Sequence, residues 1–210
     1  MFKSMRFLFL IFVTIASLVL GPVTSVKALT VPAEINKSFT PIAIVSGGTS
    51  KLRVTVYNPN VNPLTSASWT DNFPAGITVA NPVVVTQTCA GTITDAANAP
   101  IAAGSTSLKL TAGTVPAQVG STPGRCYVEV DVTSTTAGNL INTIPAGALT
   151  STTLDGATPV AITNTTPASA TLNVIAVQPP SLSKNFVPNT IGVGQTSVLT
   201  ITIRNNDTNN

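Results

Sequence analysis

The sequence predicts an all-β protein: an antiparallel β-sandwich organised as a tandem repeat, with the second copy truncated. Three observations predict it. Apolar and polar residues alternate with period two in several short segments, turn-forming residues separate these segments, and nothing after residue 28 carries a convincing helical period. Val, Ile and Leu are abundant enough to bury a core, which argues against disorder.

Alternation is clearest in two segments, residues 51–56 and 126–132. Each places every second residue on one apolar face, and the intervening residues are polar, charged or aromatic. Because successive side chains of a strand point to opposite faces, each segment is expected to be a strand with one buried and one solvated face. The expected turns are Gly47-Gly48, Asn58-Pro59-Asn60, Phe73-Pro74-Ala75-Gly76, Thr122-Pro123-Gly124 and Asp155-Gly156.

The N-terminus has the pattern of a secretory signal peptide. Lys3 and Arg6 precede an apolar run over residues 7–20, and Val26-Lys27-Ala28 supplies small residues for cleavage after Ala28. An uncleaved anchor is the alternative, but the run is shorter than the roughly 20 residues that span a bilayer. Residues 1–28 are therefore expected to be removed, and the rest to be secreted or displayed at the cell surface.

Removal of the signal peptide also changes the charge balance. The whole chain has 10 basic and 7 acidic residues, but three basic residues (Lys3, Arg6 and Lys27) lie in the signal peptide, which leaves 7 of each. The remaining basic residues are scattered, so nothing forms the positive patch that phosphate backbones require. Neither nucleic acid nor a small-molecule substrate is an expected partner.

A repeat organises the chain. Ile35-Asn-Lys-Ser-Phe-Thr-Pro41 returns as Leu182-Ser-Lys-Asn-Phe-Val-Pro188, a period of 147 residues (184 minus 37). Such a repeat marks a unit that an array can reuse. We expect a first unit over residues 29–177, a stiff linker over 178–181 and the start of a truncated second unit over 182–210.

Cys89 and Cys126 remain after processing and are expected to form a disulfide, because an exported protein meets an oxidising compartment. A metal site is the alternative, but the sequence has no histidine and two cysteines alone are a poor ligand set for zinc. Asp155-Gly156 and residues 205–210 lack the spacing of a calcium loop. No metal or cofactor is expected.

Five motifs in order resemble the immunoglobulin-like conserved-repeat domains of bacterial secreted and surface proteins, the domain of unknown function of type eleven and its relatives. The motifs are Lys37-Ser-Phe-Thr-Pro41, Thr70-Asp-Asn-Phe-Pro-Ala-Gly76, the pair Cys89-Ala-Gly91 and Cys126, Gly138-Asn-Leu-Ile-Asn142, and Ala168-Ser-Ala-Thr-Leu172. The resemblance implies an immunoglobulin-like antiparallel β-sandwich in tandem arrays, used as a spacer or in adhesion, without catalytic residues.

The residues themselves also disfavour an enzyme. Without histidine, Ser-His-Asp and Cys-His arrangements are excluded. Glu129 and Asp131 lie two apart on one strand, so we expect a solvated face there and not a glycosidase pair. Asn36-Lys-Ser and Asn164-Thr-Thr match the glycosylation triplet but stay unassigned, since most such matches go unmodified in bacteria.

One pair of ionisable groups has an unusual placement. Lys37 shares strand parity with Ile35 and Phe39, and Asp71 shares it with Trp69, so both are expected to point inward. A buried charge is costly unless it is paired. We expect a buried Lys37–Asp71 ion pair or a lysine that reaches the surface; alternatively, with Asn142, the three residues form an intramolecular isopeptide crosslink.

The favoured function is a non-catalytic structural spacer in an exported repeat protein. Its expected partners are neighbouring repeats of the same chain and components of the cell envelope or surface. The alternative is an adhesin-type module that recognises a glycan or protein through its loops. Trp69 and Tyr57 are the bulky candidates for such a surface, although Trp69 fits the core better.

Overall fold

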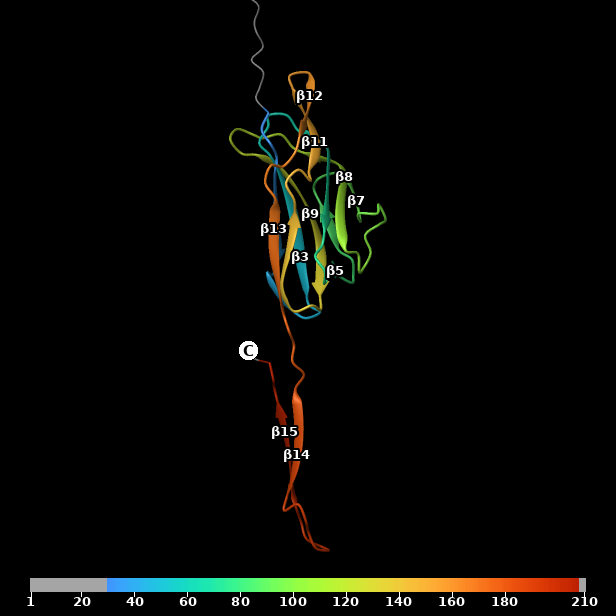
Figure 1. Cartoon of the computed structure of the whole chain (residues 1–210), viewed down its shortest axis with the longest axis vertical. Helices are drawn as coiled ribbons and strands as arrows, with labels where there is room; N and C mark the ends of the chain where they lie inside the picture. The colour runs from blue at the N-terminus through green and yellow to red at the C-terminus, as the bar shows by residue number, and fades with distance from the viewer. Residues whose placement is uncertain (1–29, 208–210) are drawn as a thin grey trace, which may run out of the picture.

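The computed structural model describes residues 30–207 as fifteen β-strands and contains no helix in that part of the chain (Figure 1). The all-β class predicted from period-two patterning is therefore confirmed for these residues. The expected cleavage position, Ala28, lies outside the described residues.

One layer of the sandwich is an antiparallel sheet in the order β1-β3-β9-β5, with β6 pairing beside β5 on the same strand, β9. The bounds are β1 (Glu34–Thr40), β3 (Thr49–Asn58), β5 (Ile77–Val79), β6 (Val85–Gln87) and β9 (Gly124–Ser134). The two segments with the clearest alternation are β3 and β9, and their apolar positions are fully buried: Leu52, Val54, Val56, Val128, Val130 and Val132.

The opposite layer contains two sheets. The first has the order β10-β13-β2 and the second the order β12-β11-β4-β8-β7, and β10 lies against β4. The bounds are β2 (Ala43–Val45), β4 (Leu64–Asn72), β7 (Thr92–Thr94), β8 (Ser107–Val115), β10 (Gly138–Ile144), β11 (Thr150–Asp155), β12 (Thr158–Ile162) and β13 (Ala168–Ile175). Between the layers, Trp69 is only 2% exposed, so it is a core residue as its strand parity indicated.

The chain changes layers directly after β1. Past the cis Thr40-Pro41 bond, β2 leaves the β1–β3 sheet and pairs with β13. This pair is parallel, whereas the sequence predicted antiparallel pairing throughout. The exception arises because the chain crosses to the other layer without reversing its direction.

A separate hairpin follows β13 and lies beyond the end of the sandwich in the view of Figure 1. It consists of β14 (Ser181–Val187) and β15 (Val198–Arg204), which pair with each other. Both strands alternate apolar and polar residues, yet both are exposed along their whole length. The hairpin therefore presents an apolar face with no covering layer among the described residues.

Candidate functional site: a buried lysine–aspartate–asparagine cluster

Lys37, Asp71 and Asn142 meet inside the sandwich. The Lys37 Nζ atom lies 2.7 Å from both carboxylate oxygens of Asp71. The Asn142 Nδ2 atom donates to Asp71 Oδ2 at 3.0 Å. The side chains of Lys37 and Asp71 are completely inaccessible to solvent, and Asn142 is fully buried.

Three strands supply the cluster, and strand alternation orients each side chain inward. Lys37 lies in β1 between the buried residues Ile35 and Phe39 on the same face. Asp71 follows Trp69 on the inner face of β4, and Asn142 precedes Ile144 on the inner face of β10. The cluster therefore joins β1 in one layer to β4 and β10 in the other.

Burial shifts both charged groups toward their neutral forms. Desolvation lowers the pKa of Lys37 to about 8, although the nearby Asp71 carboxylate opposes the shift. Desolvation likewise raises the pKa of Asp71, against the opposing effects of Lys37 and the Asn142 hydrogen bond. Proton transfer from the lysine ammonium to the carboxylate is consequently much easier here than in water.

The Asn142 side chain is hydrogen-bonded at one end only. Its Nδ2 atom donates to Asp71, but its Oδ1 atom is buried without a hydrogen-bond partner. Buried polar atoms are nearly always paired in folded proteins. The cluster therefore contains an amine, a proton acceptor and an incompletely satisfied carboxamide, which are the components of an acyl-transfer reaction.

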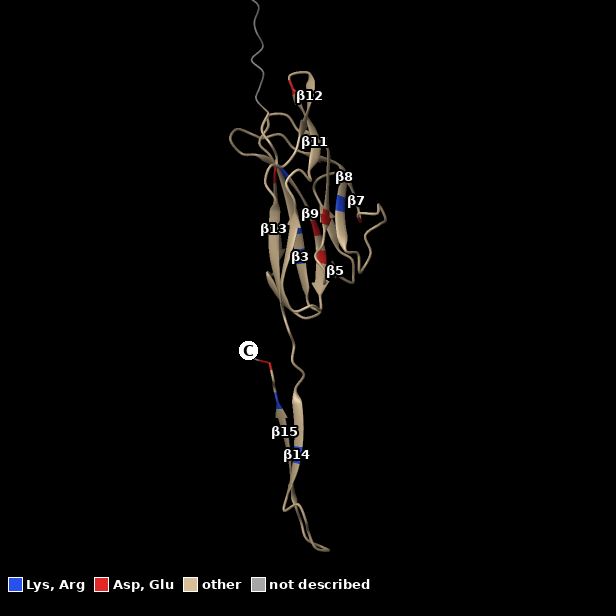
Figure 2. Cartoon of the chain, in the orientation of Figure 1, with Lys and Arg blue, Asp and Glu red and all other residues tan. Residues whose placement is uncertain are grey.

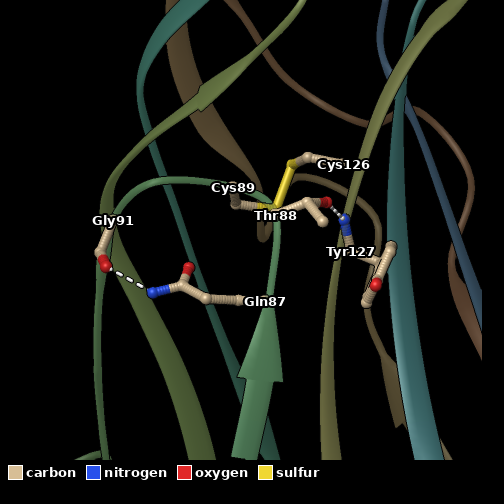
Figure 3. Close-up of a disulfide and its surroundings, with 6 residues drawn as sticks. All are labelled: Gln87, Thr88, Cys89, Gly91, Cys126 and Tyr127. Atoms are coloured by element: carbon tan, nitrogen blue, oxygen red, sulfur yellow. Dashed lines mark hydrogen bonds between the residues drawn. A yellow bond between two sulfur atoms is a disulfide. The ribbon is translucent and has the colours of Figure 1, made fainter.

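The two cysteines form a disulfide between the loop after β6 and the start of β9 (Figure 3). Their Cα atoms lie 4.9 Å apart, and both side chains are buried. Thr88 braces the loop, because its Oγ1 atom accepts a hydrogen bond of 3.0 Å from the backbone N–H of Tyr127. The bond thus ties a short surface loop to a central strand.

Glu129 does not lie on a solvated face as the sequence suggested. Its carboxylate accepts a 2.7 Å hydrogen bond from Arg53 Nε and a 2.9 Å bond from Thr86 Oγ1. The Lys51 ammonium approaches it to 3.9 Å, and Arg53 also stacks over the Tyr127 ring at 4.3 Å. Although Glu129 is on the outer face of β9, these neighbours cover it and leave its side chain only 11% exposed.

Three buried asparagines were missed as structural residues by the sequence reasoning. Asn58 and Asn60, expected only as turn residues, hydrogen-bond to each other at 2.9 Å, and Asn60 also binds the backbone of Val31. Asn164 is 1% exposed and its Nδ2 atom donates to two backbone carbonyls. The Asn164 side chain of its glycosylation triplet is therefore inaccessible in the folded unit. Only the turn chemistry of asparagine hinted at these roles.

Charges are sparse and scattered along the described strands (Figure 2). Within residues 30–207, no three histidine, cysteine, aspartate or glutamate side chains are grouped so that they could hold a metal ion. A shallow hollow lies beside Trp69, Lys109 and Pro145. Over the same part of the chain, no helix is long and apolar enough to cross a membrane.

Comparison with solved structures finds distant likenesses. The seventh ScaB type I cohesin from Pseudobacteroides cellulosolvens is 11% identical with a TM-score of 0.46, and the alignment covers 69% of this chain and 94% of that one. A non-cellulosomal cohesin from Archaeoglobus fulgidus is 12% identical with a TM-score of 0.39, covering 69% and 92%. The pilus backbone RrgB from Streptococcus pneumoniae is 14% identical with a TM-score of 0.37, covering 62% and 33%.

No curated protein matches the sequence. A family model does match, over residues 33–174, which spans the sandwich from its first strand to β13. The more specific resemblance to the type-eleven family stays a prediction. The chain belongs to the family described as Domain of unknown function (DUF7933).

Proposed function

We propose that the chain is a non-catalytic spacer from an exported surface protein, in which units of this fold follow one another. The observation that carries the proposal is the hairpin β14–β15, which reproduces the β1–β3 pair of the first unit 147 residues later. Glu34 pairs with Tyr57 in the first unit, and Ser181 pairs with Arg204 in the hairpin. Every residue pair along the two ladders is likewise shifted by 147 positions.

Hydrogen bonds outside the strand ladder repeat as well. Ser50 Oγ donates to the Pro41 carbonyl at 2.6 Å, and Ser197 Oγ donates to the Pro188 carbonyl at 2.5 Å. Before the first strand, the N–H of Val31 donates to the Asn60 side chain at 2.7 Å. The N–H of Gln178 donates to the Asp207 side chain at the same distance. The equivalence therefore extends beyond the apolar pattern to specific polar contacts.

The apolar face of the hairpin supports a second unit of the same kind. Leu182, Phe186 and Leu199 are 71%, 48% and 46% exposed. Their equivalents in the first unit, Ile35, Phe39 and Leu52, are at most 3% exposed because the opposite layer covers them. An exposed apolar surface of this kind is unfavourable in water unless something packs on it. We propose that further strands of the same protein cover it.

A spacer is favoured over an adhesin by the position of the best candidate for ligand contact. Trp69, the single tryptophan, lies in the core and is unavailable to a ligand at the loops. An array of sandwiches joined in sequence instead extends a protein along one axis, and such arrays contact mainly their neighbours.

A replacement experiment in the full-length protein tests the spacer. Residues 30–177 would be deleted, or exchanged for an unrelated sandwich of equal end-to-end length, and antibody access to a distal epitope on intact cells would be measured. A spacer predicts that deletion reduces access and the unrelated sandwich restores it. Binding of the isolated chain on glycan and matrix-protein arrays, together with failure of the exchange, would establish the adhesin instead.

The protein sequence that the gene encodes after residue 210 tests the repeat. Asp71 follows Lys37 by 34 positions, and Asn142 follows Asp71 by 71. We expect an aspartate and an asparagine at similar spacings after Lys184, the equivalent of Lys37. A downstream sequence without period-two strands would contradict the array.

A further inference from the structure

We propose that Lys37 and Asn142 form an intramolecular isopeptide bond, with Asp71 as the catalytic residue that transfers the proton. The inference concerns covalent chemistry within one unit. It goes beyond the spacer function and does not rest on it.

The geometry places the carboxylate between the two reacting groups. Asp71 Oδ2 lies 2.7 Å from the Lys37 nitrogen and 3.0 Å from Asn142 Nδ2, the nitrogen that leaves. One oxygen can therefore accept a proton from the nucleophile and deliver it to the leaving group. Proton transfer of this kind requires hydrogen-bond distances of about 2.6–3.2 Å.

The reaction balances without any added reagent. The Lys37 ammonium first gives a proton to the Asp71 carboxylate and becomes a neutral amine. Its nitrogen then attacks Cγ of Asn142, and the Cγ–Nδ2 bond breaks as Asp71 passes its proton to Nδ2. Nδ2 departs as ammonia, Asp71 takes up a second proton from the lysine nitrogen, and a new Nζ–Cγ amide remains.

Burial favours both the first step and the product. The lowered pKa of Lys37 and the raised pKa of Asp71 bring the neutral amine and acid within reach at ordinary pH. A buried ion pair carries a desolvation cost that its mutual attraction only partly offsets. The product replaces it with an amide and a neutral carboxylic acid, so the reaction removes two charges from the core.

The molecule contains its own negative control. Lys109 Nζ lies 2.8 Å from the side-chain oxygen of Asn98, so this pair also brings an amine to a carboxamide. The contact is exposed. Because this pair lacks the burial that surrounds Lys37 and Asn142, we expect no crosslink there.

The bond would connect the two layers of the sandwich. Lys37 lies in β1 near the entry of the chain, and Asn142 lies in β10 of the opposite layer. The covalent loop between them encloses both cysteines of the disulfide. A chain pulled from its two ends could then extend only outside residues 37–142.

Intact-mass spectrometry of the purified mature chain tests the proposal, after reduction so that the disulfide does not contribute to the mass. The expected mass is one ammonia below that calculated from the sequence. Trypsin should also fail to cleave after Lys37, leaving residues 29–51 joined to residues 126–184. A full, undiminished mass would overturn the proposal and leave only the buried ion pair.

Three variants locate the chemistry. Asn142→Ala removes the electrophile, Asp71→Asn removes the proton acceptor, and Lys37→Arg keeps the positive charge but cannot be deprotonated in a protein. All three should have the full mass, whereas Lys109→Arg, the matched control, should retain the ammonia deficit. A deficit that persists in Asn142→Ala contradicts the assignment. The mass of the unsubstituted chain alone decides whether the bond exists, so the proposal stays testable even if a variant fails to fold.

Discussion

Glu129 contributes to stability mainly in its ionised form. Its burial opposes ionisation, but hydrogen bonds from Arg53 and Thr86 and the charges of Arg53 and Lys51 outweigh that effect, so its pKa lies below the ordinary glutamate value of 4.5. A carboxyl with a lowered folded pKa stabilises the protein above its unfolded pKa. That contribution is lost as the pH falls through the folded value.

We therefore expect Glu129→Gln to reduce the free energy of unfolding by about 1 kcal/mol at neutral pH, since the partly exposed Arg53 limits the gain. The difference from the unmodified protein should shrink toward zero as the pH falls well below 4.5. Urea denaturation at several pH values measures both quantities. A difference that is the same at every pH would show that packing and not charge is responsible.

Strand parity predicts a residue's face but not what covers it. Parity assigned Lys37 and Asp71 to the inner face, and the structure buries both. It also assigned Glu129 to the outer face, which is where Glu129 lies. Its burial there depends on Arg53 from β3 and Thr86 from β6, two strands whose register on β9 no local pattern specifies. Asn142 was a candidate for the crosslink without a parity argument, and for the same reason its distance from Asp71 could not be predicted.

At the scale of elements, β4 and β8 show why bounds and register were harder to predict. Their pairing shifts register twice, and Ser66 and Ala112 adopt positive φ angles of 54° and 55° at these irregularities. Bulges of this kind break the period-two pattern that identifies strands. The regular strands β3 and β9 were readable from sequence, whereas β4 alternates cleanly only from Ala67 to Asp71 and β8 lacks a clean alternation.

The start of β9 depends on a close approach of two backbones at Gly124. A Cβ atom there would lie 1.9 Å from the Pro116 carbonyl oxygen. Because the obstacle is backbone, Gly124→Ala should force the loop away from β9 and lower the free energy of unfolding by about 2 kcal/mol. Gly104→Ala is a useful comparison, since its Cβ meets nothing within 4 Å and only its φ of 86° opposes the change. Equal destabilisation by the two, measured by thermal melting, would contradict the steric explanation.

The disulfide also involves β9, through Cys126, and should contribute substantially to the free energy of unfolding. Its cysteines are separated by 37 positions, and closing such a loop stabilises a fold by about 4 kcal/mol on the chain-entropy model. We expect Cys89→Ala with Cys126→Ala to lower the free energy of unfolding by about that amount in urea denaturation. Removing both cysteines avoids a free thiol that could pair with another chain. A loss below about 1 kcal/mol would mean that strain in the folded loop offsets the entropic gain.

At the scale of the whole molecule, two parts differ in what stabilises them. The sandwich buries its apolar faces between two layers, as the predicted core required. The hairpin β14–β15 keeps its hydrogen bonds within residues 178–207, and its apolar face is open. The hairpin has the same register as the β1–β3 pair, because similar residues in the same order favour the same pairing.

Shortening the chain after Val177 should therefore leave the sandwich intact. We expect the melting temperature of the remaining unit to change little, because the removed strands pair only with each other. The fluorescence of a dye that binds exposed apolar surface should fall sharply, since Leu182, Phe186 and Leu199 are lost with the hairpin.

Leu199→Thr with Ile201→Thr in the full chain is the matched control. Both side chains are about half exposed in the hairpin, and threonine retains strand propensity there. Dye binding should fall in this variant while the strands remain. If the shortened chain instead melts at a markedly lower temperature, residues 178–207 belong to the first unit, and the open apolar face must pack against the sandwich in solution. If the temperature is unchanged and the dye signal falls in both variants, the hairpin is an independent element whose apolar face is free to receive the strands of a following unit.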